Sequence, residues 1–185
     1  LVHALNSQLI AGVSCLGAAL VADDWHACHA ASGKTYRYEL DASQSINPLR
    51  ARYAWRPPKR PALADLQAAA ALIPGQRDWR AFARSSDHRE DYVRLIEDVS
   101  WSAEQISAHQ SRLLCHVRGA GFTYHLVRSV VGAMIATATK QCSLTDLKLA
   151  LRAEPSSAAD FQAPAKGLCL ESVHYAPAIN WIFQH

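Results

Sequence analysis

Two stretches of the chain alternate apolar and polar residues, a pattern that predicts β-strands with one buried face. In residues 35–40 the two faces are distinct: Tyr36, Tyr38 and Leu40 against Thr35, Arg37 and Glu39. Residues 112–118 alternate in the same way, and residues 93–101 are predicted to form the neighbouring strand, joined to it by a hairpin through residues 103–111. Residues 13–22 and 168–175 are also β-prone and apolar, so we expect strands there.

Two longer segments carry the signals of α-helices. Residues 62–73 are rich in Ala and Leu, begin directly after Pro61 and stop at Pro74, so both ends carry the start and stop signals expected of a helix. Residues 122–139 place apolar side chains on one helical stripe: Val127, Val130, Val131, Met134 and Ile135. The other side of this helix is predicted to carry four residues: Tyr124, His125, Arg128 and Gly132.

The remaining segments are shorter or irregular. Ser143 with Asp146 three residues later matches a capping box and predicts a short helix that reaches residue 151. Prolines divide residues 43–61, which we expect to form a long loop, and residues 154–160 are expected to form a polar surface loop. The fold class predicted from this order is α+β, with an antiparallel sheet backed by the helices at residues 62–73 and 122–139.

Size and composition exclude several classes of protein. The chain has 185 residues, of which 50% are hydrophobic and 19% charged, so it resembles a globular protein rather than a disordered or fibrous one. The longest apolar stretch, residues 126–138, is interrupted by Arg128 and Ser129 and is too short to predict a transmembrane helix. We therefore expect one domain, or one and a half, with a sizeable core.

Charge is concentrated in one window of the sequence. The formal net charge is +3, yet the segment from residue 34 to residue 60 alone contains seven basic and two acidic residues, an excess of five. The basic residues are Lys34, Arg37, Arg50, Arg52, Arg56, Lys59 and Arg60, and the interleaved rings are Tyr36, Tyr38, Tyr53 and Trp55. Such a segment is either solvated surface or a binding site for single-stranded or looped RNA, where cations contact phosphates and rings stack on bases.

Two details bear on the origin of the chain. Residue 1 is leucine and the single methionine is Met134, so we expect an internal fragment of a longer protein. The five cysteines are odd in number, scattered and never in a Cys-x-x-Cys pair, which favours an intracellular, reducing compartment over a disulfide scaffold. Cytoplasm, nucleus and organelle stay open at this stage.

Arg128 is the most conspicuous candidate for chemistry, because it lies inside the most apolar predicted helix. A guanidinium in that setting needs a carboxylate, a phosphate or a carbonyl as partner, unless it extends to solvent or pairs with a scaffold carboxylate. His26, Cys28 and His29 are close enough in sequence to suggest metal binding, but no second ligand pair follows at a recognisable spacing. A small strand residue is the better interpretation of Cys28.

Five segments, in order along the chain, resemble motifs of one enzyme family. They are LNSQL at residues 5–9, WHACHAASGKTYRY at 25–38, GQRDWRAF at 75–82, FTYHLVRSVVG at 122–132 and APAKGLCL at 163–170. They are similar to the segments "LN--LP", "FHAR-S-A-KRYRY", "G-HDF--F", "FLYHMVRNIVG" and "AP--GL-L" of the TruA family of tRNA pseudouridine synthases. The resemblance covers nearly the whole chain.

The resemblance implies an isomerase that converts uridine to pseudouridine in the anticodon stem-loop of tRNA, typically at nucleotides 38 to 40, without metal or organic cofactor. It implies a fold like the C-terminal half of such a synthase, with residues 1–24 as a remnant of the N-terminal half and residues 25–185 as the C-terminal domain. The implied partner is tRNA, and no association with a membrane is implied. Members of the family are often homodimers.

The resemblance also implies roles for individual residues. Arg128 aligns with the arginine that pairs with and orients the catalytic aspartate, and Tyr36 aligns with the tyrosine that lies against the target uracil; both are implied as catalytic. Lys34, Arg37 and His125, together with Tyr36, are implied as contacts to RNA. A planar ring such as Tyr36 can hold a detached base by stacking.

The chain departs from the family pattern in a few places. No Gly-Arg-Thr-Asp segment occurs, so the catalytic aspartate has no counterpart among these residues, and Asp78 matches a different family position. Cys28, Ile10 and Ser129 stand where the family has Arg, Pro and Asn. We therefore expect the fragment alone to be inactive.

Two alternatives remain open on sequence grounds. One is a non-catalytic RNA-binding or assembly protein that kept the fold and lost the aspartate. The other is a zinc protein that uses His26, Cys28 and His29, which would require stoichiometric metal and which we do not expect.

Overall fold

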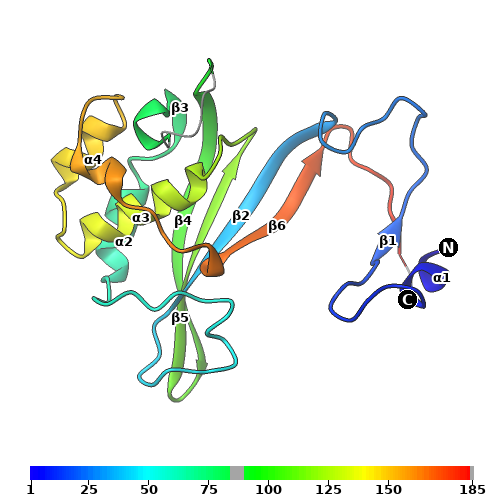
Figure 1. Ribbon diagram of the computed structural model, residues 1–185, viewed down its shortest axis with the longest axis horizontal. Coiled ribbons are helices and arrows are strands. Elements are labelled where there is room, and N and C mark those ends of the chain that lie inside the picture. Colours follow the sequence, from blue (N-terminus) through cyan, green and yellow to red (C-terminus); the bar gives the residue numbers. More distant parts are fainter. Residues whose placement is uncertain (84–89, 184–185) are drawn as a thin grey trace. The chain divides into compact units, whose positions relative to one another are not determined.

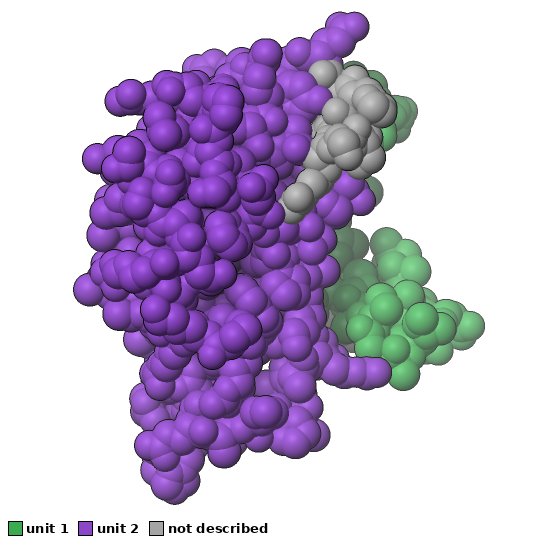
Figure 2. Space-filling view, turned by 60° about the vertical axis from the view of Figure 1, so that its left-hand side comes forward, with its two compact units in different colours: residues 1–32, 174–185 green, residues 33–173 purple. Residues whose placement is uncertain are grey.

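A computed structural model describes residues 1–83 and 90–183 of the chain. The chain divides into two compact units (Figures 1 and 2). The smaller unit consists of Leu1–Ser32 and the C-terminal residues from His174 onward, and the larger unit is Gly33–Val173. Each unit is described by itself below.

The larger unit is built on a five-stranded sheet with the strand order β3-β4-β5-β2-β6 (Figure 1). The strands are β2 (Ala31–Asp41), β3 (Gly75–Asp78), β4 (Val93–Ser107), β5 (Gln110–Gly119) and β6 (Leu168–Tyr175). Antiparallel pairing joins β3 to β4, β4 to β5 and β5 to β2. The predicted antiparallel sheet is confirmed, although β3 was not expected from the sequence.

Alternation along β2 decides which side chains enter the core. Tyr38 and Leu40 are fully buried and pack with residues that stand opposite or beside them on β5, such as Cys115 and Val117. Residues 35, 37, 39 and 41 project to the other face of the sheet, because side chains of a strand alternate between faces. The face division predicted for residues 35–40 is therefore confirmed.

Helices α2 (Leu63–Ala70) and α3 (Leu126–Ala138) contribute to the same hydrophobic core as the buried face of the sheet (Figure 1). Twelve of the thirteen residues of α3 are buried, the exception being Arg128. Helix α4 (Leu144–Ala150) begins with the predicted capping box, in which Ser143 Oγ accepts a hydrogen bond from Asp146 N at 3.1 Å. Three short 3₁₀ turns, Arg80–Phe82, Ser157–Asp160 and Ala165–Gly167, complete the unit.

The predicted start of α3 is wrong by four residues. The sequence pattern placed the helix from residue 122, whereas α3 begins at Leu126. His125 adopts a left-handed backbone conformation with φ of 61°, which a right-handed helix cannot include. Tyr124 and His125 therefore precede the helix and do not share a helical stripe with Arg128 and Gly132.

The smaller unit contains α1 (Val2–Asn6) and a two-residue pairing of β1 (Gly17–Ala18) with β7 (Ile182–Phe183). The strand predicted over residues 13–22 is therefore wrong except at β1. The Asn6 side chain bonds both the N–H and the C=O of Cys15, at 2.7 and 2.9 Å, so these backbone groups are satisfied without a neighbouring strand. Apolar side chains of the run stay in solvent, Leu20 at 97% exposure.

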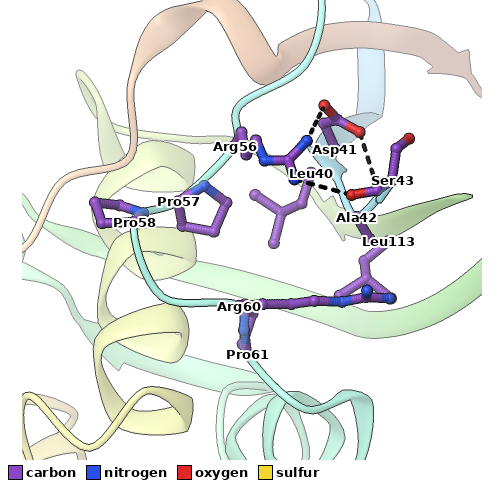
Figure 3. A pocket seen from close by; sticks show the side chains of 10 residues that line it. All are labelled: Leu40, Asp41, Ala42, Ser43, Arg56, Pro57, Pro58, Arg60, Pro61 and Leu113. Atoms are coloured by element: carbon purple, nitrogen blue, oxygen red, sulfur yellow. Dashed lines mark hydrogen bonds and ion pairs between the residues drawn. The ribbon is translucent and has the colours of Figure 1, made fainter. Parts of the chain in front are cut away.

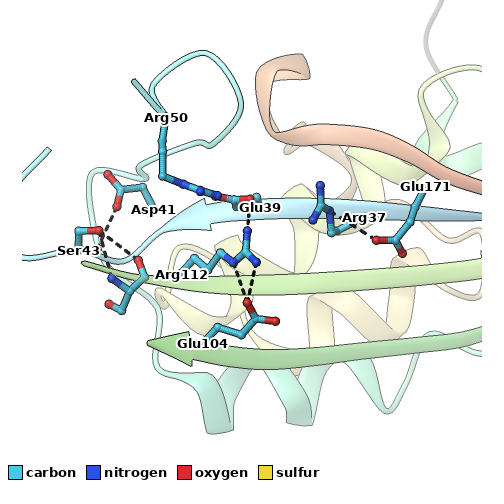
Figure 4. Close-up of polar contacts among 9 residues, drawn as sticks. Arg37, Glu39, Asp41, Ser43, Arg50, Glu104, Arg112 and Glu171 are labelled. Carbon is cyan, nitrogen blue, oxygen red and sulfur yellow. Dashed lines mark hydrogen bonds and ion pairs between the residues drawn. The ribbon is translucent and has the colours of Figure 1, made fainter. Parts of the chain in front are cut away.

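Charged residues occupy the face of the sheet that α2 and α3 leave open (Figure 4). Glu39 on β2 is only 4% exposed and forms ion pairs with Arg50 of the 43–61 loop and with Arg112 of β5, the latter at 3.2 Å. Arg112 also bonds Glu104 of β4 at 2.7 Å. Glu39 thus joins the basic loop to the sheet, and the loop itself has no helix or strand, as predicted.

The 161–167 segment packs unusually close to α3 and β2. A Cβ atom built on Gly132 would lie 2.8 Å from both Ala163 N and Phe161 O, and one built on Gly167 would lie 2.6 Å from Cζ of Tyr38. Real Cβ atoms do not approach other atoms this closely. Only glycine at these two positions allows the segment to lie directly on the helix and on the tyrosine ring.

Among the described residues, none of the helices combines the length and the apolar character that crossing a membrane requires.

The first prediction concerns Gly132. Gly132→Ala should lower the free energy of unfolding by about 2 kcal/mol, because the overlap with the 161–167 backbone outweighs the gain in helix propensity of about 1 kcal/mol. The matched control is Gly121→Ala, whose new Cβ would meet nothing closer than Arg94 Cδ at 3.9 Å. Urea unfolding of both variants measures the difference, and equal stability would contradict the close packing described here.

The second prediction concerns the buried carboxylate. Glu39→Gln should lower the free energy of unfolding by about 1–3 kcal/mol, since it leaves two arginines without their shared buried anion. Glu104→Gln is the control: Glu104 contacts the same Arg112 but its side chain is 47% exposed. A loss from Glu39→Gln no larger than the loss from Glu104→Gln, in the same urea titration, would count against a structural role for the network.

Candidate active site

A pocket of about 100 Å³ lies at the N-terminal end of α3. It is lined by Tyr36, Phe122, Thr123, His125, Leu126, Val127, Arg128 and Leu168. These residues come from β2, from the segment that leads into α3, from the first turn of α3 and from the first residue of β6. Three of the five residues proposed from the sequence, Tyr36, His125 and Arg128, therefore lie around one cavity.

Arg128 finds its partner in a backbone carbonyl. Its Nε donates a hydrogen bond to Ala163 O at 2.8 Å, and its own carbonyl accepts one from Ala163 N at 3.0 Å. Among residues 1–83 and 90–183, no carboxylate forms an ion pair with Arg128. The guanidinium is thus held by one edge, while its terminal nitrogens are suited to a further acceptor, for which a carboxylate or phosphate is the natural choice.

Tyr36 presents an aromatic surface to the same pocket. Its ring is half-buried and meets the ring of Phe122 edge to face, with centroids 5.2 Å apart and planes at 89°. Phe122 was not singled out by the sequence reasoning, although it opens one of the matched motifs. The two rings together form an apolar wall of the kind that holds a planar base.

His125 reaches the pocket through its left-handed backbone rather than through a helical position. Its ring stacks on Tyr124, with centroids 3.7 Å apart. Tyr124 is exposed. The stacked rings of Tyr124 and His125 therefore lie directly before the first residue of α3.

Lys34 and Arg37 lie on opposite faces of β2. Lys34 shares the face of Tyr36 by register, two residues away, but does not line the pocket. Arg37 projects from the charged face, where its Nε lies 3.7 Å from Glu171 Oε1 (Figure 4). The structure therefore separates Arg37 from the cavity that holds Tyr36 and Arg128.

Several basic side chains of the 43–61 loop form ion pairs or hydrogen bonds with carboxylates and backbone carbonyls of the larger unit. Arg50 pairs with Glu39, and Lys59 Nζ donates to Thr139 O at 2.7 Å. Arg52 and Arg60 are exposed. Of the rings proposed for base stacking, Tyr38 is fully buried and cannot take part, whereas Tyr53 is 69% exposed.

Arg56 and Asp41 form one side of a second pocket, of about 130 Å³, which is lined also by Arg60 and three prolines (Figure 3). Arg56 Nη1 lies 3.4 Å from Asp41 Oδ2. Burial by itself would raise the pKa of Asp41, but hydrogen bonds from Ser43 and the charge of Arg56 outweigh it and hold that pKa below its usual range. Of the two arginines in this pocket, Arg56 already has a carboxylate partner.

The possible zinc ligands do not converge. His26 Nδ1 accepts hydrogen bonds from the backbone N–H groups of Cys28 and His29, at 3.1 and 3.4 Å. Within the part of the chain that the structure describes, no three His, Cys, Asp or Glu side chains lie close enough together to hold a metal ion. All five cysteines are free.

Comparison with known proteins gives a consistent result. Residues 68–176 match the family described as tRNA pseudouridine synthase. The chain is 32% identical over 174 residues to tRNA pseudouridine synthase A of Shouchella clausii, covering 94% of this chain and 65% of that protein. It is 30% identical over 172 residues to the enzyme of the same name from Limosilactobacillus reuteri, covering 93% and 66%, and 34% identical over 165 residues to that of Halalkalibacterium halodurans, covering 89% and 61%.

The chain thus spans slightly less than two thirds of the length of these three relatives. The family match covers more than half of the chain and includes α3 with Arg128, the segment 161–167 and all of β6, while Tyr36 lies outside the matched range. On this match and on the similarity to the three relatives, the chain belongs to the tRNA pseudouridine synthase family.

Proposed function

We propose that the intact protein isomerises uridine to pseudouridine in the anticodon stem-loop of tRNA, and that this chain supplies the arginine and tyrosine side of the active site. The observation that carries the proposal is the shared pocket of Tyr36 and Arg128 in a chain of this family. The relatives quoted above are named as tRNA pseudouridine synthases, which supports the choice of substrate.

The chemistry is an isomerisation and its atoms balance without a second substrate. The bond from the ribose carbon to the uracil nitrogen breaks, the base turns while held, and a bond from the same ribose carbon to a ring carbon of uracil forms. The proton on that ring carbon is lost and the ring nitrogen gains one, so no net oxidation occurs. Tyr36, supported by Phe122, provides the surface that holds the base between the two bonds.

Arg128 acts on the carboxylate that starts the reaction. The family's aspartate motif does not occur in these 185 residues, so we propose that the carboxylate comes from another segment of the intact protein. A guanidinium fixed at Nε by Ala163 can donate from its terminal nitrogens, which keeps a neighbouring carboxylate ionised and aimed.

The RNA must be held tightly enough to offset the few kcal/mol that extrusion of a base costs. We propose Lys34 and His125 as contacts close to the pocket, with exposed Arg52 and Arg60 as further phosphate contacts. Arg37, which pairs with Glu171, is proposed as a contact only to RNA that reaches the charged face. A homodimer stays a prediction, which sedimentation of the intact protein tests.

The third prediction tests the site residues. In the intact protein, Arg128→Ala and Tyr36→Phe should each lower kcat for tRNA by roughly a hundredfold or more, because the first removes the group that aims the carboxylate and the second removes the hydroxyl that we propose takes part in proton transfer. The control is Arg118→Ala, an exposed arginine on the charged face that pairs with Glu97 at 2.7 Å. Single-turnover release of tritium from uridine labelled at carbon 5 measures the rate.

Turnover close to wild type in both variants would remove Arg128 and Tyr36 from the mechanism. An intact wild-type protein that binds tRNA but releases no tritium would support the alternative of a non-catalytic RNA-binding protein.

The fourth prediction concerns the RNA contacts. Lys34→Gln should raise the KM for tRNA severalfold with kcat unchanged, and should reduce the slope of log Kd against log salt concentration by about 0.7–0.9, the loss of one phosphate contact. Lys148→Gln, an exposed lysine on α4 far in sequence from the pocket residues of β2, is the control. An unchanged salt slope in Lys34→Gln would show that Lys34 contacts no phosphate.

A further inference from the structure

Arg128 is hydrogen-bonded to Ala163, the residue that precedes Pro164. Ala163 is bonded to Arg128 twice, through its carbonyl to Nε and through its N–H to the backbone carbonyl. Pro164 has no N–H, so its own backbone cannot donate a hydrogen bond that would hold the segment on the C-terminal side of Ala163. A side chain that bonds the segment beyond Ala163 would limit the directions in which the Ala163 carbonyl can point.

Tyr38 is placed to do this. Its hydroxyl donates a hydrogen bond to Pro164 O at 2.7 Å, one residue beyond the carbonyl that holds Arg128. Its ring lies directly under Gly167, where a Cβ atom would come within 2.6 Å of Cζ. The tyrosine therefore contacts the 161–167 segment at two points, three residues apart, on the C-terminal side of Ala163.

The ring itself cannot move away. Tyr38 is fully buried on β2, opposite Cys115 of β5, inside the main core. Burial raises the pKa of its hydroxyl well above the ordinary value, against the opposing charge of Arg128, so the group stays protonated and remains a donor at physiological pH. A rigid donor and a close glycine contact are the two features expected of a side chain that fixes a loop.

The same strand carries Tyr36, two residues earlier on the same face, into the pocket. Leu168, the residue after Gly167, also lines that pocket. A displacement of the 161–167 segment would thus move the partner of Arg128 and one wall of the cavity together.

We propose that Tyr38 is a positioning residue: its hydrogen bond to Pro164 and its contact with Gly167 fix the Ala163 carbonyl, which in turn aims the Arg128 guanidinium into the pocket. The inference rests on the proposed function for its effect on turnover, but the link from Tyr38 to Arg128 can be measured without activity. Tyr38 touches neither the base nor the carboxylate in this account.

The test uses Tyr38→Phe in the intact protein, a change that removes one oxygen and keeps the buried ring. We expect kcat to fall about tenfold, with KM for tRNA changed by no more than about twofold. The lost hydrogen bond lets the Arg128 guanidinium change its orientation, whereas the residues that bind RNA are unaffected. Tyr175→Phe is the matched control, since it also removes a hydroxyl bonded to a backbone carbonyl, that of Ala27 at 3.1 Å.

Two further measurements separate positioning from a general loss of structure. In an Arg128→Lys background, Tyr38→Phe should lower kcat by less than about twofold, because residues that act through one another are not additive. The ¹⁵N signal of Arg128 Nε–H, identified by its absence in Arg128→Lys, should shift and exchange faster with water in Tyr38→Phe and stay unchanged in Tyr175→Phe. Tyr38→4-aminophenylalanine restores a donor and should restore both the signal and most of kcat.

Three results would overturn the proposal: an Nε–H signal that Tyr38→Phe leaves unchanged, a full additional loss of kcat in the Arg128→Lys background, or no rescue by the 4-amino variant. If the intact wild type shows no isomerisation, the proposed function fails while the Nε–H measurement still decides the link. If Tyr38→Phe does not fold, the 4-amino variant tests the link from Tyr38 to Arg128. The proposal predicts a wild-type Arg128 Nε–H signal in that variant, and a shifted signal contradicts it.

Discussion

The contact between the 161–167 segment and α3 is the constraint on which the site depends. Arg128 lies in a helix whose other residues are all buried, and its charge is tolerated because the Ala163 carbonyl accepts a hydrogen bond from its Nε–H. The backbone of residues 161–163 can lie so close to the helix only because Gly132 has no side chain. The same contact provides an acceptor for Arg128 Nε–H and holds in place a residue that lines the pocket, so packing and chemistry depend on one arrangement.

Strand β2 serves three purposes through simple alternation. Tyr36 enters the pocket, Tyr38 enters the core and fixes the 161–167 segment, and Glu39 on the other face is buried between two arginines. One face of the strand therefore carries the site and its support, and the other holds the 43–61 loop on the sheet. A shift of register by one residue would exchange the two faces and lose both functions.

Periodic elements were predictable from the sequence and local backbone exceptions were not. The alternation in residues 35–40, the apolar stripe of α3 and the Ser143 capping box each gave a correct element because one local rule decides each of them. Residues 13–22 have the composition of a strand, but Asn6 satisfies the backbone of Cys15 and pairing extends over only Gly17–Ala18. The start of α3 depends on the left-handed conformation of His125, which no periodicity reveals. For the site, the sequence singled out Arg128 and Tyr36, but the carbonyl partner of Arg128 and the ring of Phe122 come from segments that only tertiary packing brings together.

The most direct test of the account is a crystal structure of the intact protein bound to a tRNA anticodon stem-loop. The account predicts an aspartate carboxylate within about 3 Å of the terminal nitrogens of Arg128, as in a charge-assisted hydrogen bond, while Nε stays bonded to Ala163 O and the extruded uracil lies on the ring of Tyr36. A guanidinium turned away from Ala163, or a target uridine bound at a distance from Tyr36, would contradict it.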